Sequence, residues 1–418
     1  MRTNLLINFR RDKNSVKNIL ENKKLRLERD AKKITIGIDA CNIKVGGTLT
    51  HLIGFLKESN PSKQGFGRMV IWSSNDTLQK LPTQKWLEKK THKWLNGSFV
   101  LAFLFQKFYL EREAKRMICD IMFVPGGVFL SSFKPFVTIS QNLLPFEKKE
   151  LNRYMNFKLK LKFLLLRFCQ SHTFAKADGL IFLTKYARKV ISQSVRIAEN
   201  NTVIPHGINP LYVAEPRVQR PISNYSQRNP FKLLYVSILS PYKHQWNVAE
   251  AVCRLHAKQI PVHLTLVGPA ETESLKMLNE VLQNYSNSKN AIEYKGGIPH
   301  EQLFAIYKEA DSFIFGSTCE NLPIILIEAM SAGLPILCSS YGPMPEVLGN
   351  NEGMYFDPLQ INDIEEKIIE FLNSNIKRQK MADESFKSAV KYSWADMTAD
   401  THRFINKTYS KIKGQLSH

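Results

Sequence analysis

The sequence predicts an α/β protein made of two doubly wound, Rossmann-like domains. Its 418 residues exceed one ordinary core and favour two domains of about 200 residues each. In both halves, short apolar segments typical of buried parallel strands alternate with helical segments. Residues 214–230 hold three prolines and many polar side chains, and they are predicted to form a linker or surface loop between the two series.

The first series predicts a parallel sheet that begins at residues 33–39. A loop with Gly46 and Gly47 follows, and then a helix over residues 48–59. Further strands are expected at residues 68–73, 120–124, 136–139, 179–182 and 202–204, with helical segments at residues 104–119, 147–177 and 185–194. Residues 1–33 are basic and polar, and we expect them to be an extension outside the core fold.

The second series predicts another parallel sheet. Its strands are expected at residues 231–237, 262–268, 292–295, 312–315, 335–338 and 354–356. A helix is expected between Pro323 and Gly333, because proline suits the first turn of a helix and glycine suits the position after its end.

The net charge of +21 is concentrated in the first half of the chain. Residues 1–205 contain 37 lysines and arginines against 15 acids, a balance of +22. Residues 206–418 contain 21 against 22, a balance of −1. This asymmetry indicates an anionic partner for the first half, which can be nucleic acid, an acidic substrate or an anionic membrane surface.

The remaining composition is typical of a soluble globular protein, with 44% hydrophobic and 23% charged residues. The six cysteines are scattered without a C-x-x-C pair, so we expect reduced thiols in the cytoplasm. The apolar run near the N-terminus is too short for a signal peptide, and the run at residues 99–105 is too short to cross a bilayer.

Two glutamates, Glu320 and Glu328, lie eight positions apart across a predicted junction between a loop and a helix. The N-terminus of that helix presents free backbone N–H groups and the positive end of its dipole, which suits a phosphate. Carboxylates on either side can accept hydrogen bonds from sugar hydroxyls. The junction therefore predicts a nucleotide-sugar site, although two glutamates at this spacing also arise by chance on surface helices.

The run from Glu320 to Pro323, with Glu328-Ala329-Met330 after it, resembles the E-x7-E signature of retaining glycosyltransferases of the GT-B fold, of the family 4 or group 1 type. The resemblance extends over residues 34–410 and implies two Rossmann-like domains that face each other across a cleft. It makes residues 34–205 the acceptor- and membrane-facing domain and residues 206–395 the nucleotide-sugar-binding domain. Residues 203–208 resemble the hinge segment of the family, and residues 396–418 are expected to form a helix that returns to the first domain.

The resemblance implies catalytic and donor-binding roles for individual residues. Lys243 follows the strand at residues 231–237 and would contact a phosphate of the donor. Glu320 would contact the donor hexose and Glu328 the ribose hydroxyls. Gly46 and Gly47 open a helix after the first strand, so their backbone can approach the leaving phosphate without a clash from Cβ.

Four further residues are expected in the donor site by the same resemblance. Asn321 and Leu322 would offer backbone N–H groups to the diphosphate. Gly297 and Ile298, after the strand at residues 292–295, resemble the segment whose backbone contacts the base.

The sequence departs from the family pattern at two places. Ile238 stands where many members carry an arginine, so a second cation must come from elsewhere. Gln141 and Asn142 stand in the region where many members carry a histidine; they can hydrogen-bond a sugar hydroxyl but cannot act as a base near neutral pH. The mechanism that fits is therefore one in which the leaving phosphate oxygen takes the proton of the acceptor on the same face, which gives retention.

No metal or other cofactor is expected besides the nucleotide sugar, because the sequence has no D-x-D between strands and no His/Asp cluster with metal-ligand spacing. The expected function is transfer of a hexose from a nucleoside diphosphate sugar to a saccharide, lipid-linked acceptor in cell-surface polysaccharide synthesis. A basic first domain suits a peripheral enzyme at the anionic inner face of the cell membrane. Residues 151–172 carry five basic side chains among many apolar ones. This pattern is compatible with a core helix with snorkelling lysines and with a helix that faces a membrane or the acceptor.

Two other functions are compatible with parts of this pattern. One is a nucleotide-sugar epimerase with a GT-B-like fold. The other is a basic nucleic-acid-binding protein, but no recognised nucleic-acid-binding motif accompanies the charge, so no nucleic acid partner is expected.

Overall fold

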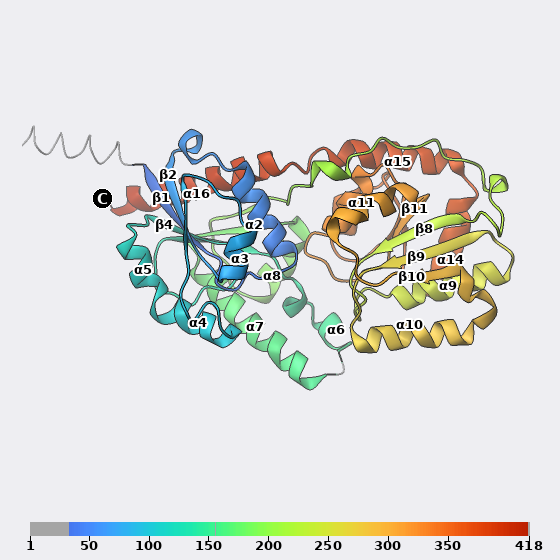
Figure 1. Cartoon of the computed structure of the whole chain (residues 1–418), viewed down its shortest axis with the longest axis horizontal. Coiled ribbons are helices and arrows are strands. Elements are labelled where there is room, and N and C mark those ends of the chain that lie inside the picture. Colours follow the sequence, from blue (N-terminus) through green and yellow to red (C-terminus); the bar gives the residue numbers. More distant parts are fainter. Residues whose placement is uncertain (1–32, 155, 417–418) are drawn as a thin grey trace, which may run out of the picture.

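The computed structural model describes residues 33–154 and 156–416, and it shows two α/β domains joined by a hinge (Figure 1). The predicted N-terminal extension, apart from Lys33, lies outside the described residues. Each domain is built on an entirely parallel sheet with helices packed against it. The predicted fold class is confirmed.

The N-terminal domain contains a seven-stranded sheet with the order β3-β2-β1-β4-β5-β6-β7. Its strands are β1 (Ile34–Asp39), β2 (Phe66–Trp72), β3 (Leu87–Lys90), β4 (Ile121–Val124), β5 (Phe136–Ser140), β6 (Gly179–Phe182) and β7 (Asn201–Val203). All six strands expected in this half are present. The additional strand β3 lies at the edge of the sheet, and its sequence Leu-Glu-Lys-Lys lacks the apolar pattern that marks a buried strand.

Two helices expected in this half are divided in the structure. The segment expected at residues 104–119 forms α4 (Phe99–Phe108) and α5 (Leu110–Arg116), and it begins earlier because the Ser98 hydroxyl caps the first turn by accepting the Leu101 N–H. The segment expected at residues 147–177 forms α6 (Lys148–Leu151) and α7 (Phe157–Lys176), since Asn156 caps a new helix start. The other helices here are α2 (Gly47–Glu58), α3 (Asn75–Lys80) and α8 (Lys185–Ser194).

The C-terminal domain contains a six-stranded sheet with the order β10-β9-β8-β11-β12-β13. Its strands are β8 (Phe231–Val236), β9 (Val262–Val267), β10 (Ile292–Tyr294), β11 (Ser312–Phe315), β12 (Ile336–Ser339) and β13 (Met354–Phe356). Its helices are α9 (Gln245–Ala257), α10 (Thr272–Asn284), α11 (His300–Glu309), α12 (Ile324–Ser331), α13 (Met344–Leu348), α14 (Ile361–Leu372) and α15 (Asn375–Ala389). All six strands expected in this half are present, and Gly333 follows α12 with φ 67°, as its predicted position after the helix requires.

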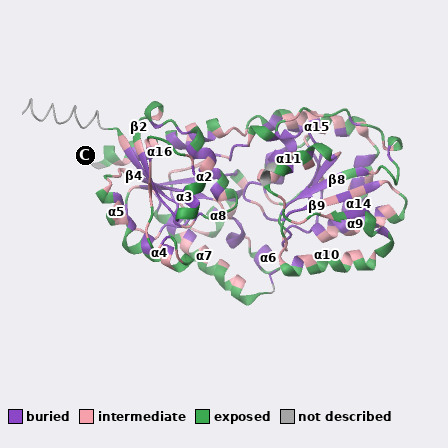
Figure 2. Cartoon of the chain, viewed as in Figure 1, coloured by how far each residue is buried: buried purple, intermediate pink, exposed green. Residues whose placement is uncertain are grey.

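The buried residues concentrate on the strands of both sheets and on the helix faces against them (Figure 2). The six cysteines are all free thiols. Within the described residues, no helix is long and apolar enough to span a membrane.

The hinge consists of two chain segments that cross between the domains. Ile208 donates its N–H to the Tyr392 carbonyl at 2.8 Å and pairs with Ser393 in a parallel bridge. A Cβ on Gly207 would lie 2.2 Å from the Trp394 nitrogen, so only glycine allows the segments to approach so closely. Helix α16 (Trp394–Leu416) then leaves the C-terminal domain and packs on α2, β4 and β6 of the N-terminal domain.

Candidate active site

Two loops of the C-terminal domain, one after β8 and one after β11, meet where the two domains contact each other, and this boundary between the domains is called the cleft. These strands are neighbours in the sheet, and loops at the carboxyl ends of neighbouring parallel strands lie together. Thr318 donates its N–H to the Tyr242 carbonyl at 2.8 Å, and Tyr235 donates its hydroxyl to the Lys243 carbonyl at 2.5 Å. These hydrogen bonds fix the two loops against each other.

Lys243 and Glu320 project from these two loops and form an ion pair between Nζ and Oε1. The two side chains are only 6% and 14% exposed. The Lys243 ammonium also lies 4.9 Å from the ring centroid of Phe315. The pair therefore holds one positive and one negative charge at the cleft in surroundings with little water, where each charge interacts strongly with a ligand.

The polar side chains around this pair are neutral near neutral pH. Burial, with a further contribution from the Glu320 carboxylate, raises the pKa of Tyr235 and of Tyr242 well above the ordinary value. Burial lowers the pKa of His244 to about 3, with a smaller contribution from Arg153, and a ring nitrogen of this histidine lies 3.2 Å from the Thr318 hydroxyl. His244 is therefore a weak base that supports the loop.

Asn321 joins the two domains beside the ion pair. Its Nδ2 donates to the Ser140 carbonyl at 2.7 Å, and its own carbonyl accepts the Thr184 hydroxyl at 3.0 Å. The backbone N–H groups of Asn321 and Leu322 have no hydrogen-bond acceptor in the part of the chain that the structure describes. They precede the N-terminus of α12, where an anion is favoured.

Gly46 and Gly47 face this point from the N-terminal domain. A Cβ on Gly47 would lie 3.8 Å from Cδ1 of Ile324, the first residue of α12. Gly46 has φ 77°, and a Cβ there would meet nothing within 4 Å, so the positive φ is what requires glycine. The N-terminus of α2 thus faces that of α12 across the cleft.

Gln141 and Asn142 lie at the same cleft, because they follow Ser140, whose carbonyl binds Asn321. Gln141 donates Nε2 to the Pro125 carbonyl at 3.0 Å, and Asn142 accepts the Leu144 N–H at 3.1 Å. Each side chain thus uses one of its polar groups to support the loop.

The other predicted donor residues lie on α12 and after β10. Glu328 lies within α12, is 4% exposed, and accepts a hydrogen bond from the Tyr307 hydroxyl at 3.2 Å. Gly297 and Ile298 follow β10, the edge strand that β9 separates from β8, and Gly297 lies against Pro269. Among the described residues, no hydrogen bond or ion pair joins Gly297 or Ile298 to Lys243 or Glu320.

Sequence reasoning missed Glu346, which also bridges the domains. From α13, its carboxylate accepts the backbone N–H groups of Lys185 and Tyr186 at 2.7 and 2.8 Å. These two N–H groups form the N-terminus of α8 in the other domain. Because the contact joins residues about 160 positions apart, no local sequence pattern could have identified it.

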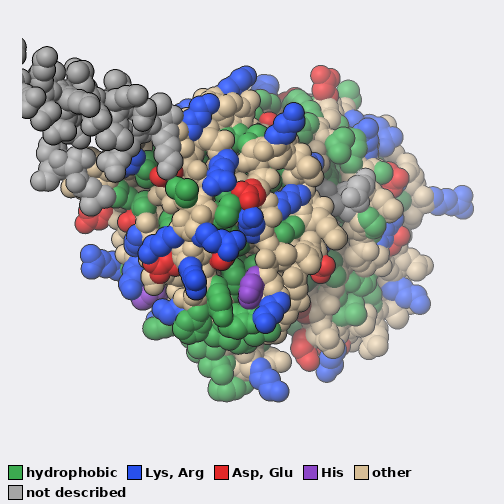
Figure 3. Space-filling view, turned by 60° about the vertical axis from the view of Figure 1, so that its left-hand side comes forward, with side chains coloured by type: hydrophobic (Ala, Val, Ile, Leu, Met, Phe, Trp, Pro, Cys, Tyr) green, Lys and Arg blue, Asp and Glu red, His purple; other side chains and the backbone are tan. Residues whose placement is uncertain are grey.

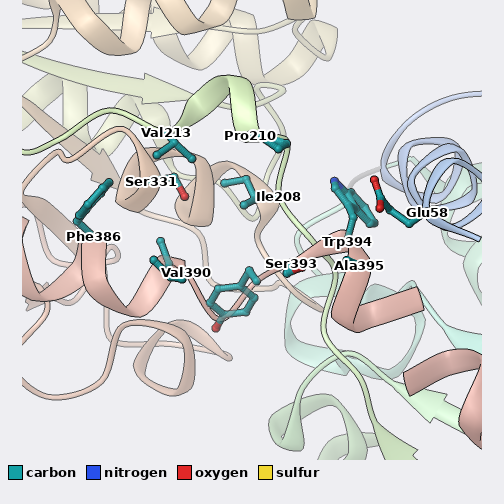
Figure 4. Close-up of a pocket in the computed structure, with 12 residues that line it drawn as sticks. Glu58, Ile208, Pro210, Val213, Ser331, Phe386, Val390, Ser393, Trp394 and Ala395 are labelled. Carbon is teal, nitrogen blue, oxygen red and sulfur yellow. The ribbon is translucent and has the colours of Figure 1, made fainter. Parts of the chain in front are cut away.

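Two cavities lie between the domains. One of about 660 Å³ opens beside α10 and is lined by Arg153, Tyr154, Trp246 and Glu271, among others. The other, of about 480 Å³, lies at the hinge, where Figure 4 shows Trp394, Ile208 and Glu58 around it. Among the described residues that line the hinge cavity, Glu58 is the one with a charged side chain, so this cavity disfavours an anionic ligand.

Solved structures share the two-domain fold of this chain. Sucrose-phosphate synthase from Thermosynechococcus elongatus superposes with a TM-score of 0.70 at 15% identity, covering 90% of this chain and 100% of that one. HepE from Anabaena, in complex with UDP, superposes with a TM-score of 0.61 at 18% identity, covering 92% and 99%. The predicted GT-B fold is confirmed.

Sequence comparisons identify the C-terminal domain more closely. Residues 220–388 match the family model "Glycosyl transferases group 1". O-antigen chain mannosyltransferase B of Escherichia coli is 32% identical over 110 residues, which are 26% of this chain and 29% of the relative. The serotype-specific mannosyltransferase WbdA of Escherichia coli is 22% identical over 266 residues, 62% of this chain and 32% of the relative.

The matches span about a third of the length of these curated relatives. The similarity to group 1 glycosyl transferases is thus a property of residues 220–388, and Lys243 and Glu320 both lie within this segment.

Proposed function

We propose that this protein is a retaining glycosyltransferase that moves a hexose from a nucleoside diphosphate sugar to a saccharide acceptor. The observation that carries the proposal is the position of Lys243 in a cleft where the N-termini of α2 and α12 face each other. An ammonium group and two helix N-termini suit a diphosphate. In this proposal Glu320 binds the donor hexose, and Asn321 and Leu322 donate their backbone N–H groups to the diphosphate.

The chemistry follows from the charge that develops during transfer. As the bond between the anomeric carbon and the phosphate oxygen breaks, negative charge builds on the diphosphate, and Lys243 with the backbone N–H groups stabilises it. The acceptor oxygen bonds to the anomeric carbon on the same face, and its proton passes to the departing phosphate oxygen. Because His244 is a weak base and Gln141 and Asn142 are amides, the proposal assigns no protein base.

The remaining donor contacts and the second cation belong to the same proposal. Glu328 would bind the ribose if its carboxylate exchanged the Tyr307 hydroxyl for a ribose hydroxyl, and Gly297 with Ile298 would border the base. Arg153 lines the 660 Å³ cavity and pairs with Glu150 at 2.8 Å, and in this proposal it would supply the positive charge that Ile238 does not. We propose that the reaction proceeds without a metal.

The acceptor is proposed to be a lipid-linked glycan in cell-surface polysaccharide synthesis. Support comes from the names of the relatives, which are O-antigen and serotype-specific mannosyltransferases, and mannose is accordingly the first sugar to test. Residues 33–205 carry 27 lysines and arginines against 11 acids, a balance of +16. This charge favours a peripheral position at the anionic inner face of the cell membrane.

A donor screen tests the proposal. Purified protein is mixed with UDP-, GDP- and ADP-sugars, and thermal unfolding identifies a donor that stabilises it. NMR then follows slow hydrolysis of that donor, with and without EDTA. We expect one class of donor to raise the melting temperature and to release sugar with its anomeric configuration retained in both conditions. No stabilisation by any donor, or release with inversion, would contradict the proposal.

A further inference from the structure

The N-terminal domain exposes an unusual number of large apolar side chains on α4 and α7, which run along its lower edge in Figure 1. These side chains are between 37% and 77% exposed. They are Phe99, Val100, Leu104 and Phe108 of α4 and Phe157, Leu161, Leu164, Leu165 and Phe168 of α7, and together they form the α4–α7 surface. An exposed apolar surface of this kind usually marks an interaction site.

The apolar side chains of α7 occupy one face of the helix. Phe157, Leu161, Leu165 and Phe168 follow each other at intervals of three or four residues, which places them on the same side. The buried residues Gln170, Thr173 and Phe174 lie near the other end of the helix. The sequence allowed two interpretations of residues 151–172, a core helix with snorkelling lysines or a helix that faces a membrane or the acceptor. The core-helix interpretation is wrong for this face, because its apolar side chains point outward.

The C-terminal ends of α4 and α7 are held near each other by one chain segment, Val128-Phe129. Gln106 of α4 donates Nε2 to the Val128 carbonyl at 3.1 Å. The hydroxyl of Thr173, on α7, accepts the Phe129 N–H at 2.9 Å. The C-terminal ends of the two helices therefore lie close together, and Figure 3 shows hydrophobic side chains gathered on the lower part of this face with lysines and arginines around them.

The charge around the α4–α7 surface has one sign. Residues 96–110 and 151–172 contain no aspartate or glutamate, whereas Lys107, Lys158, Lys160, Lys162 and Arg167 lie among the apolar residues. A second copy of the chain would bring the same positive charge against this surface, which disfavours self-association. An anionic membrane offers both complementary charge and an apolar interior.

A small basic cavity lies between the two helices. It has a volume of about 210 Å³, and Lys107 of α4 and His172 and Lys176 of α7 line it together with Lys134 and Ser131. Lys134 already pairs with Asp178 at 2.9 Å, but Lys107 and Lys176 form no ion pair with any described acid. Ammonium and hydroxyl groups around a cavity of this size suit a phosphate group.

We propose that the α4–α7 surface docks on an anionic phospholipid membrane, with its apolar side chains in the interface and a lipid phosphate in the basic cavity. The proposal names the surface and the lipid chemistry, which the proposed transfer reaction does not specify. It also stands apart from the donor site, so hydrolysis of a soluble donor would not depend on it.

Vesicle flotation tests the docking proposal with the full chain. Vesicles of phosphatidylcholine alone are compared with vesicles that also contain phosphatidylglycerol, and we expect flotation with the anionic vesicles only. The triple variant Leu161→Ser, Leu165→Ser, Phe168→Ser should bind these vesicles at least about tenfold more weakly, because three apolar side chains no longer enter the interface. Its matched control is Leu211→Ser, Val218→Ser, Ile376→Ser, which changes equally exposed side chains elsewhere and should bind like the wild type.

The basic cavity is tested with Lys107→Ala and Lys176→Ala together, against Lys380→Ala and Lys391→Ala in the C-terminal domain. The first pair should weaken binding severalfold and the second pair should not, since surface cations near the bilayer contribute most. Thermal unfolding and soluble-donor hydrolysis confirm that each variant is folded.

Three results would overturn the docking proposal. One is no flotation of the wild type with anionic vesicles. Another is equal flotation of the wild type and the triple variant. The third is a dimer in sedimentation that the triple variant abolishes, which would assign the surface to a second copy of the chain.

Discussion

The ion pair between Lys243 and Glu320 connects the two loops that carry the proposed chemistry. Both side chains are largely buried, so each charge depends on the other in the absence of a ligand. A diphosphate in the cleft would offer the Lys243 ammonium a second anionic partner, and a sugar hydroxyl would offer Glu320 a donor. The same contact can therefore hold the loops before binding and release both groups for the ligand.

Glu320→Gln keeps the shape of the side chain and removes its charge. We expect kcat for donor hydrolysis or transfer to fall by about 100- to 1,000-fold, the size of effect seen when one group that stabilises the transition state is lost. Lys243→Ala should have an effect of similar size. Steady-state kinetics measure both changes, and thermal unfolding checks the fold.

The matched control for these variants is Lys258→Ala. Lys258 also forms an ion pair with a glutamate of the C-terminal domain, Glu365, but at the C-terminal end of α9. Turnover of this control should stay near that of the wild type. Near-normal turnover of Glu320→Gln, or an equal loss in Lys258→Ala, would remove the support for the proposed site.

The sequence predicts the place of a single residue when that residue lies next to a recognisable strand or helix. Glu320 and Lys243 follow strands that a short apolar pattern identifies, so their loops could be placed at one edge of a sheet. Glu346 could not be found in this way, because its partners are backbone N–H groups in the other domain. The interdomain bond of Asn321 was also not predictable, since it depends on how far the cleft is closed.

The hinge is the element on which the arrangement of the domains depends. Gly207→Ala would place a methyl group 2.2 Å from the Trp394 nitrogen and 2.4 Å from its Cα, and the backbone would have to move. We expect destabilisation by about 2 kcal/mol or more, in the range of strain and overpacking effects. Urea unfolding monitored by fluorescence measures this change.

Gly414→Ala is the control, because a Cβ at this helical glycine meets nothing within 4 Å. Alanine there should stabilise the protein by up to about 1 kcal/mol through helix propensity. A Gly207→Ala variant as stable as the wild type would show that the hinge segments do not need this close approach.

The hydrogen bonds between Glu346 and the N-terminus of α8 join the two domains across the cleft. In Glu346→Ala, the backbone N–H groups of Lys185 and Tyr186 lose their acceptors, and we expect their hydrogen exchange to become about tenfold faster, since one such bond is worth roughly 1 kcal/mol or more. Glu352→Ala on the same domain is the control, since its carboxylate bonds Ser388 within that domain. Unchanged hydrogen exchange at Lys185 and Tyr186 would mean that these hydrogen bonds between the domains do not form in solution.

At the element scale, the sequence predicts buried strands well and helix breaks poorly. The strands at the centres of both sheets can be recognised by their apolar composition. Edge strand β3 cannot, because it carries two lysines and a glutamate. The continuous apolar and basic pattern around α4 and α7 gives no sign that helices end at Phe108 and at Leu151. Capping by Ser98 and Asn156 sets the actual starts of α4 and α7.

Four buried histidines, His51, His206, His244 and His402, couple the stability of the whole molecule to pH. Burial lowers the pKa of His206, His244 and His402 to about 3 in each case. Unfolding returns each ring to water, where its pKa is near 6.5, so between pH 3 and 6.5 the unfolded chain binds more protons than the folded one. The free energy of unfolding should therefore fall as the pH drops below 6.5.

Each histidine contributes at most about 1.4 kcal/mol per pH unit in this range. Urea unfolding at pH 7, 6 and 5 measures the slope. His402→Phe should reduce the slope, because the ring of His402 stacks on Phe55 and is buried against the core, where phenylalanine does not titrate. A stability that is constant from pH 7 to pH 5 would contradict the burial of these neutral histidines.

For the whole molecule, the sequence predicts two domains but not how they meet. Their relative position depends on the crossing at Gly207 and Trp394, on α16 packed against α2, and on contacts made by single side chains such as Asn321. None of these is a periodic pattern in one segment. The sequence also did not show that the apolar side of α7 is exposed, because this depends on which side of the helix packs against the domain.

The most direct test of the central claim is a crystal structure with the donor that the thermal screen identifies. We predict that its diphosphate lies between the N-termini of α2 and α12, in contact with the Lys243 ammonium and the backbone N–H groups of Asn321 and Leu322. A nucleotide bound in the hinge cavity beside Trp394, or anywhere else away from Lys243, would contradict the proposed donor site.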